Sequence, residues 1–150
     1  MKMITTALAF CTALASITTF ASEPDEILGI WTTEGAKSQV EVFKCGQQLC
    51  AKVVSLKDAV YTDPEEGPLG QPKTDIHNPD PAKRKQPLLG LQIMEGLTPD
   101  GEGTWANGTI YDPENGKIYN SKVSLDGSGR LNVRGFIGIS LIGRTTLWIR

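Results

Sequence analysis

The segment DIHNPDP, residues 75–81, carries the only histidine of the chain between two aspartates. Asp75 and His77 could form an acid–base couple, and together with Asp80 they could supply oxygen and nitrogen ligands to a metal ion. Hydrolytic chemistry would also need a nucleophile or an open metal position, and a group that stabilises an oxyanion. The sequence designates no residue for these roles, so we assign no catalytic residue, no metal ligand and no cofactor.

The same segment also has a structural interpretation. Asn78 and Asp80 each precede a proline, and such side chains bond the backbone two residues on, while the proline holds φ near about −65°. The pattern predicts an ordered loop with the basic residues 83–85 at its solvated edge. A contact with a ligand or a partner is a third interpretation.

The other candidate binding residues are aromatic or basic. Aromatic side chains in strands fill a core more often than they line a cavity. Arg134 lies within a predicted strand, where it would need an acidic partner or an anionic ligand if it pointed inward, and would be ordinary surface if it pointed outward. The candidate ligand-binding residues are Trp105, Tyr111, Tyr119, Arg134, Asp75, His77 and Asn78.

Short β-strands must position these residues. Turn signals recur about every 8 to 12 residues after position 29, and the runs between them are rich in Val, Ile, Thr, Tyr and Trp. One connection, residues 57–86, is unusually long for a compact domain, and connections of this length commonly have a function. The predicted strands are residues 29–34, 38–45, 49–56, 87–97, 103–111, 117–125, 130–136 and 144–150.

This pattern predicts an all-β fold, an eight-stranded antiparallel up-and-down barrel, because an even meander can close and remove its edges. An open sandwich is the alternative. The lumen of such a barrel is filled by side chains or is just wide enough for one small ligand. The apolar run 137–143 lacks the spacing of a phosphate loop or a nucleophile elbow. We expect it to form a buried turn, or a one-turn helix, that plugs one end of the barrel.

The N-terminus has the layout of a cleaved secretory signal. Lys2 precedes a long uncharged stretch, and Thr19 and Ala21 occupy the small-residue positions before a cut at Ser22. A transmembrane anchor is the alternative. We expect a signal peptide over residues 1–21, one β-barrel domain over residues 22–150, and a periplasmic or secreted location.

The charge of the mature chain argues against two classes of partner. Without Lys2 it has 14 Lys and Arg against 17 Asp and Glu, a net charge of −3, which provides no electrostatic footprint for nucleic acid or an anionic membrane. We expect no nucleic-acid partner and no stable membrane insertion after signal cleavage. The sequence leaves the oligomeric state open.

Cys45 and Cys50 are the two cysteines that remain after cleavage. An even pair in an exported protein predicts a disulfide, and C-x4-C without a second Cys or His cluster is a poor zinc site. If the two are bonded, we expect them to face each other across the loop 46–49, with Val42 paired to Val53.

Gly29-Ile30-Trp31 in the first strand, with Arg144 or Arg150 at the last strand, resembles the lipocalin-like barrels. In those barrels the tryptophan closes one end and a late arginine lies across its ring, a favourable cation–π arrangement. Further motifs narrow the resemblance: Cys45-Gly46, Leu49-Cys50, Lys73-Thr74-Asp75, Asn78-Pro79-Asp80, Pro87 to Leu91, Ile110 to Pro113, Gly116-Lys117, Tyr119, Arg134-Gly135-Phe136, Gly143-Arg144 and Trp148. Together they are similar to the bacterial exported family called domain of unknown function 2147. The resemblance implies a lipocalin-like barrel and export, and it implies no activity.

Three functional hypotheses follow. The first is a small exported barrel that binds an apolar or amphipathic small molecule in its lumen. The second is a periplasmic enzyme that uses Asp75, His77 and Asp80. The third is an envelope interaction protein that has a filled barrel and works through its loops. A lumen packed with Leu, Ile and Trp favours the third hypothesis, and an empty cavity with one inward charge favours the first.

Overall fold

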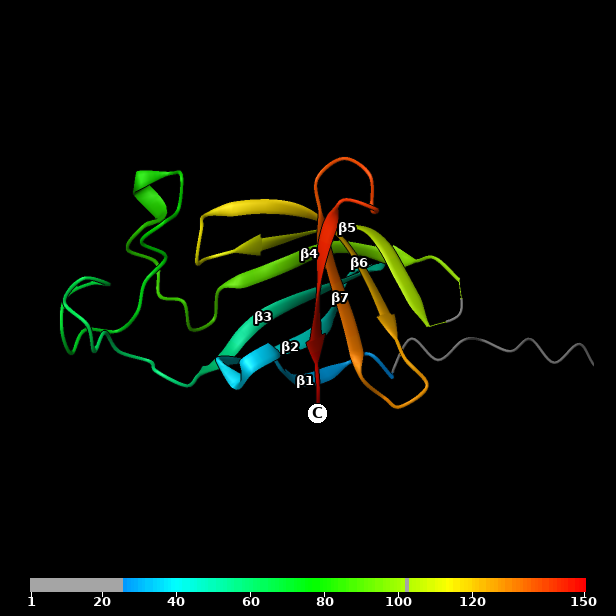
Figure 1. Ribbon diagram of the computed structural model, residues 1–150, viewed down its shortest axis with the longest axis horizontal. Coiled ribbons are helices and arrows are strands. Elements are labelled where there is room, and N and C mark those ends of the chain that lie inside the picture. Colours follow the sequence, from blue (N-terminus) through cyan, green and yellow to red (C-terminus); the bar gives the residue numbers. More distant parts are fainter. Residues whose placement is uncertain (1–25, 102) are drawn as a thin grey trace, which may run out of the picture.

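The chain forms an eight-stranded antiparallel sheet that curls into a half-barrel (Figure 1). The computed structural model describes residues 26–101 and 103–150, so the expected signal peptide lies outside the described residues. Each strand pairs with the next along the chain, which confirms the predicted up-and-down order. The strands are β1 (Gly29–Thr32), β2 (Ser38–Cys45), β3 (Gln48–Leu56), β4 (Gln92–Pro99), β5 (Thr104–Asp112), β6 (Lys117–Leu125), β7 (Leu131–Phe136) and β8 (Gly143–Trp148).

The sheet closes on itself through a small contact between its first and last strands. Thr32 and Ile149 exchange two backbone hydrogen bonds, of 2.7 and 3.0 Å, in an isolated antiparallel bridge. The hydrogen-bonded ladders run in the order β1 to β8, without a ladder from β8 back to β1 among the described residues. The result is a curled sheet with one edge of β8 largely unpaired, rather than a fully hydrogen-bonded cylinder.

One strand boundary differs from the prediction by more than two residues. The predicted strand 87–97 begins at Gln92, because residues 87–90 belong to the long connection: Pro87 bridges to Thr74, and the amide of Gly90 donates to the carbonyl of Val53. The described residues include two short 3-10 helices, η1 (Glu34–Ala36) between β1 and β2, and η2 (Pro81–Lys83) within the connection. Neither of these helices has the length and apolar character needed to cross a membrane.

Large apolar side chains fill the inside of the half-barrel. Alternate residues of the strands point inward, as the two-residue period of a strand requires. Fully buried members of this core include Trp31, Ile27, Met94, Leu97, Leu131, Val40 and Val123, and the other two tryptophans, Trp105 and Trp148, are also buried in it. The interior is therefore a packed core over most of the sheet.

Trp31 closes one end of the barrel. Its Nε1 donates to the carbonyl of Ile27 at 2.8 Å, and the guanidinium of Arg150 lies 4.4 Å from the centroid of its ring. Nη2 of Arg150 also donates to the carbonyl of Leu28 at 2.8 Å. This is the contact expected from the G-x-W motif, and it is made by Arg150. Arg144 does not contact Trp31 in this way; it forms an exposed ion pair with Glu34.

The disulfide between Cys45 and Cys50 is present, with the two Cα atoms 5.9 Å apart. The predicted register was wrong by two residues, because the hairpin uses a two-residue turn and Val42 lies opposite Ala51 rather than Val53. The cysteines are consequently diagonal neighbours, at a separation that a disulfide tolerates. A shift of two residues leaves every side chain on its original face, so Val42 and Val53 are both buried in the core as expected.

Candidate functional site

Three of the candidate residues meet in a buried polar cluster between the long connection and β5. The carboxylate of Asp75 is fully buried. Its Oδ1 accepts a hydrogen bond from the hydroxyl of Tyr111 at 2.6 Å, and its Oδ2 accepts one from Nδ2 of Asn78, also at 2.6 Å. Asp75 and Tyr111 are 36 residues apart in sequence, so this cluster fastens the connection to the sheet.

Turn chemistry holds the rest of this segment in place. Oδ1 of Asn78 accepts from the amide of Asp80, and a carboxylate oxygen of Asp80 accepts from the amide of Ala82, which caps the N-terminus of η2. Nε of Arg84 donates to the carbonyl of Asn78 at 2.8 Å. The bonds that the Asn78 and Asp80 side chains accept are those that Asn-Pro and Asp-Pro sequences favour.

The segment also packs closely against the turn between β5 and β6. Gly116 has φ +69°, and a Cβ at this position would overlap the carbonyl oxygen of His77. On the other side, the buried ring of Tyr61 packs on Gly67, and its hydroxyl accepts from the amide of Thr74 at 3.1 Å. Residues from three parts of the chain thus hold the segment as one ordered unit.

The electrostatics of the cluster do not suit acid–base catalysis. Burial, and next the hydrogen bond to Asp75, raise the pKa of Tyr111 well above its usual range, so the phenol stays protonated and donates. Both carboxylate oxygens of Asp75 are occupied by neutral donors, and the group is closed to solvent. The side chain of His77 is exposed and that of Asp80 caps η2. The three residues of the enzyme hypothesis therefore do not converge, and in the described part of the chain no three His, Cys, Asp or Glu side chains are placed to hold a metal.

The remaining candidate ligand residues lie apart from one another. Trp105 is part of the core. Tyr119 is half-buried, and its hydroxyl accepts from Nδ2 of Asn115 at 3.1 Å. Arg134 is outward, because its neighbours Val133 and Gly135 bracket it on the alternating strand and Val133 is buried. The predicted set therefore does not line one pocket.

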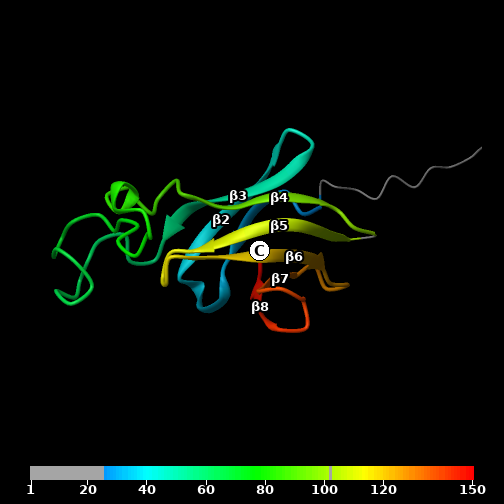
Figure 2. The same ribbon diagram turned by 90° about the horizontal axis from the view of Figure 1, so that it is seen from above.

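The apolar loop, residues 137–142 between β7 and β8, contradicts its prediction. We expected a buried plug, yet its four aliphatic side chains project into solvent: Ile137 is 68%, Ile139 60%, Leu141 85% and Ile142 69% exposed. Buried core side chains fill the interior of the half-barrel, so the loop has no cavity to enter. Trp31 and Arg150 lie at the opposite end of β8 from the loop. In Figures 1 and 2 it extends from β7 and β8 away from the sheet.

Arg134 fixes the base of this loop. Its Nε donates to the carbonyl of Ser140 at 2.6 Å, its Nη2 to the carbonyl of Leu141 at 3.3 Å, and its Nη1 to Oγ1 of Thr145 at 2.9 Å. The amide of Ile142 donates to the carbonyl of Ile139 at 3.1 Å. The role of Arg134 is thus to hold an apolar loop in one shape, which sequence reasoning missed because nothing in the strand pattern links Arg134 to a loop six residues on.

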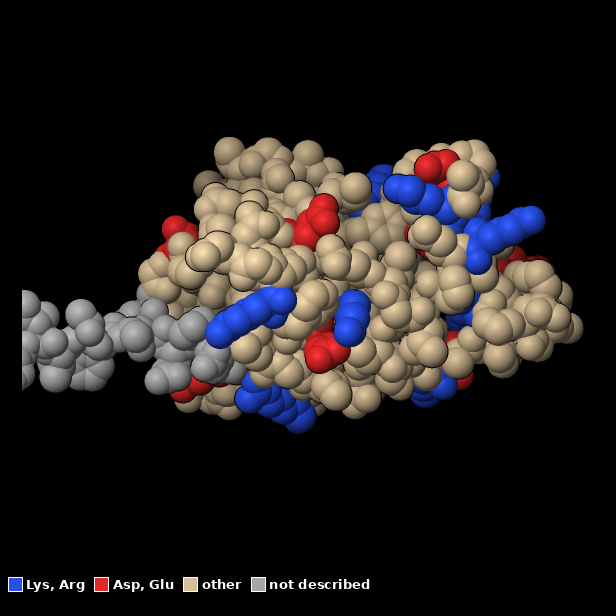
Figure 3. All heavy atoms as spheres, turned by 180° about the vertical axis from the view of Figure 1, so that it is seen from behind, with Lys and Arg blue, Asp and Glu red and all other residues tan. Residues whose placement is uncertain are grey.

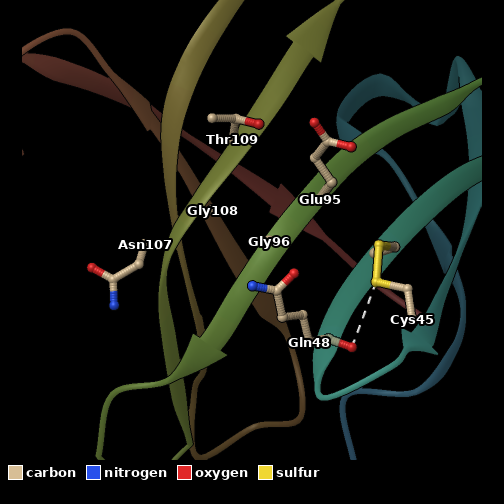
Figure 4. Close-up of a pocket in the computed structure, with 8 residues that line it drawn as sticks. Cys45, Gln48, Glu95, Gly96, Asn107, Gly108 and Thr109 are labelled. Atoms are coloured by element: carbon tan, nitrogen blue, oxygen red, sulfur yellow. Dashed lines mark hydrogen bonds between the residues drawn. A yellow bond between two sulfur atoms is a disulfide. The ribbon is translucent and has the colours of Figure 1, made fainter.

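Two open hollows flank β5. One, of about 420 Å³, lies between the disulfide hairpin and β5 and is lined by Cys45, Gln48, Cys50, Glu95, Gly96, Asn107, Gly108 and Thr109 (Figure 4). The other, of about 380 Å³, lies between β5 and the apolar loop and is lined by Ala106 to Thr109, Asn120 to Lys122, Phe136 and Ser140. A β-bulge at Asn107, whose φ is +64°, separates them.

The surface charge is mixed. On the face shown in Figure 3, basic and acidic side chains are interspersed among uncharged ones, without a field of one sign over the sheet. This agrees with the small net charge of the chain, −2 in full.

A curled eight-stranded meander whose end is closed by a tryptophan under an arginine defines a lipocalin-like protein. A family model described as "Uncharacterized protein conserved in bacteria (DUF2147)" matches residues 29–150, and the chain belongs to this family. The resemblance inferred from the sequence motifs is therefore confirmed.

A solved structure supports the fold assignment. Protein HP1028 from the human pathogen Helicobacter pylori, described as belonging to the lipocalin family, is similar with a TM-score of 0.68 and 24% sequence identity. The alignment covers 83% of this chain and 82% of that one. At this identity the likeness concerns the fold. No curated protein matches the chain.

Proposed function

We propose that this protein is an exported, lipocalin-like binding module whose barrel interior is a structural core and whose working surface is the apolar loop 137–142. The observation that carries the proposal is the exposure of four aliphatic side chains on one six-residue loop. Exposed apolar patches on monomeric proteins commonly mark interaction sites. A filled interior together with an exposed apolar loop favours the envelope-interaction hypothesis over the other two.

The proposal includes export to the periplasm or the exterior. One support is the uncharged N-terminal stretch that follows Lys2, which is typical of a secretory signal. The other is the Cys45–Cys50 disulfide, since disulfides persist in oxidising compartments. N-terminal sequencing of the protein recovered from cells should start at Ser22.

The binding proposal is tested by fractionation of cells that express the full chain. The wild type should be recovered with the envelope membranes. The variant Leu141→Ser/Ile142→Ser should move to the soluble fraction, because the two most exposed aliphatic side chains of the loop are removed. If the wild type and the variant were divided in the same proportion between the membrane and soluble fractions, the proposal would be contradicted.

A second candidate function is the binding of an apolar or amphipathic small molecule inside the half-barrel. One observation favours it: the hydroxyl of Ser121 is buried and has no hydrogen-bond partner among the described residues, on the same face of β6 as the core residue Val123. Buried hydroxyls are nearly always paired, so a polar ligand group or a water would complete this site. Organic extraction of protein purified from its native envelope, followed by mass spectrometry, tests this candidate. Recovery of one stoichiometric small molecule would support it, and an empty extract would count against it.

A further inference from the structure

Part of the backbone of the apolar loop is hydrogen-bonded within the protein. The carbonyl groups of three consecutive residues, Ile139, Ser140 and Leu141, accept hydrogen bonds from the amide of Ile142 or from the guanidinium of Arg134. A loop that docks into another protein can pair its carbonyls with donors of that protein. Hydrocarbon offers no donors, so a loop that enters it must satisfy these groups internally.

The side chains suit the same environment. From Gly135 to Gly143 the sequence GFIGISLIG contains no charged residue, and Ser140 is the one side chain with a hydroxyl. The four exposed aliphatic side chains belong to a segment that extends from the sheet in both ribbon views. A convex apolar tip fits a fluid, deformable surface without needing a complementary groove.

The charged residues near the loop in sequence are arginines, of which Arg144 pairs with Glu34 and Arg130 with Asp126. Residues 130–150 contain four arginines and no Asp, Glu or Lys. Among the described residues Arg134 has no acidic partner, since its three hydrogen bonds go to neutral oxygens. A guanidinium that contacts the loop in this way would be attracted to the phosphate groups of a bilayer when the apolar side chains enter it.

From these observations we infer that the loop 137–142 inserts into the surface of a lipid bilayer, with Arg134 at the level of the lipid phosphates. The inference rests on the proposed function and names the partner of the same surface. Six residues can reach the interfacial region, roughly 5–10 Å deep, and cannot span the hydrocarbon. The association is peripheral and reversible, and it is driven by apolar burial rather than by the net charge of the chain.

The first experiment uses a fluorescent probe in the loop of the full mature protein. Leu141→Trp places an indole at the most exposed position of the loop, while the three native tryptophans are buried and give a constant background. Vesicles of phosphatidylethanolamine and phosphatidylglycerol should shift the emission of this variant to shorter wavelength, and brominated acyl chains should quench it. An unchanged spectrum at saturating lipid, with an intact fold by circular dichroism, would overturn the inference.

The second experiment compares two variants that lose the same kind of exposed aliphatic surface. Leu141→Ser/Ile142→Ser removes two side chains of the loop, and Leu69→Ser/Leu89→Ser removes two from the long connection, where they are 58% and 55% exposed. In vesicle sedimentation the loop variant should bind at least about a hundredfold more weakly than the wild type, because it loses the apolar area of two side chains from the lipid contact. The connection variant should bind like the wild type. Equal weakening of both would overturn the inference.

The outcomes separate the inference from the proposed function. If the loop variant leaves the envelope fraction in cells but the wild type ignores vesicles, the partner is a protein and the lipid inference is wrong. If the loop variant stays with the envelope and the wild type ignores vesicles, both are wrong. If the wild type dimerises through the loop in solution and the loop variant is monomeric, a second copy of the chain is the partner and the lipid inference is again wrong.

Discussion

The segment 73–86 and the apolar loop 137–142 both connect neighbouring strands, yet their side chains are arranged in opposite ways. In the first, polar side chains turn back onto their own backbone or onto β5, and the carboxylate of Asp75 is fully buried. In the second, aliphatic side chains point into solvent while the backbone is capped by Arg134. The segment 73–86, whose residue types suggest catalysis, has a structural role. The loop 137–142, whose residue types suggest a core, lies on the surface.

The difference teaches that residue type alone does not identify a site. A carboxylate that is hydrogen-bonded to an amide and a phenol and is fully buried is closed to a substrate. A run of isoleucines and leucines becomes a candidate binding surface only when the core has no room for it. The contacts that each side chain makes, rather than the residue composition, distinguish the two loops.

The sharpest test of the first half of this comparison is Asp75→Ala. The change leaves the hydroxyl of Tyr111 and the amide of Asn78 without their shared acceptor in a buried place, so we expect it to lower the free energy of unfolding by about 2–4 kcal/mol. Urea unfolding followed by circular dichroism measures the loss. Asp63→Ala is the control, because the Asp63 carboxylate accepts from the Glu65 amide on an exposed turn of the same connection, and it should cost well under 1 kcal/mol, roughly. Equal costs for the two variants would show that the cluster is not an anchor.

Tyr111→Phe should have a smaller effect that depends on pH. Removing the hydroxyl deletes one donor to Asp75 and should cost about 1–2 kcal/mol at neutral pH. Because the folded protein raises the pKa of Tyr111 above that of the unfolded chain, about 10, this stabilisation is complete below pH 10 or so and is lost as the pH rises toward the folded pKa.

The difference in unfolding free energy between the wild type and Tyr111→Phe should therefore shrink in titrations above about pH 10. Tyr119→Phe is the matched control, because its hydroxyl meets Asn115 on an exposed turn rather than a buried carboxylate. A difference for Tyr111→Phe that stays constant up to strongly alkaline pH would contradict the assignment.

Arg134→Gln tests the other half of the comparison. The guanidinium caps two carbonyls of the apolar loop at an exposed site, so global stability should fall by less than about 1 kcal/mol. The amide of Ile142, which bonds to Ile139, should exchange with solvent faster because the loop loses its fixed shape. Arg130→Gln, which removes an exposed ion pair to Asp126, should leave this exchange unchanged. If the Ile142 amide exchanged at the same rate in Arg134→Gln, the loop would hold its shape without the Arg134 guanidinium.

The fold was largely predictable because its signals are local. Runs rich in Val, Ile, Thr, Tyr and Trp between Asn-Gly or other Gly turns identify most strands to within two residues, and the Gly-Ile-Trp motif identifies the barrel end. The hairpin register was missed because shifts of two residues preserve every face, so burial patterns cannot separate them. The exposure of the apolar loop was missed because it depends on how completely the core side chains fill the interior. That volume is a property of the assembled core.

The smallest effect is expected for His77→Ala, the residue that first suggests catalysis. Its side chain is exposed, and among the described residues its contribution to the anchor is its backbone carbonyl, against which Gly116 packs. Replacing the imidazole should therefore change the free energy of unfolding by less than about 0.5 kcal/mol, and it should leave vesicle binding unchanged because the apolar loop is intact. Urea unfolding and vesicle sedimentation measure the two quantities. A loss of several kcal/mol, or the disappearance of a hydrolytic or metal-dependent activity in His77→Ala, would move the functional site back to the segment 73–86 and reverse the comparison.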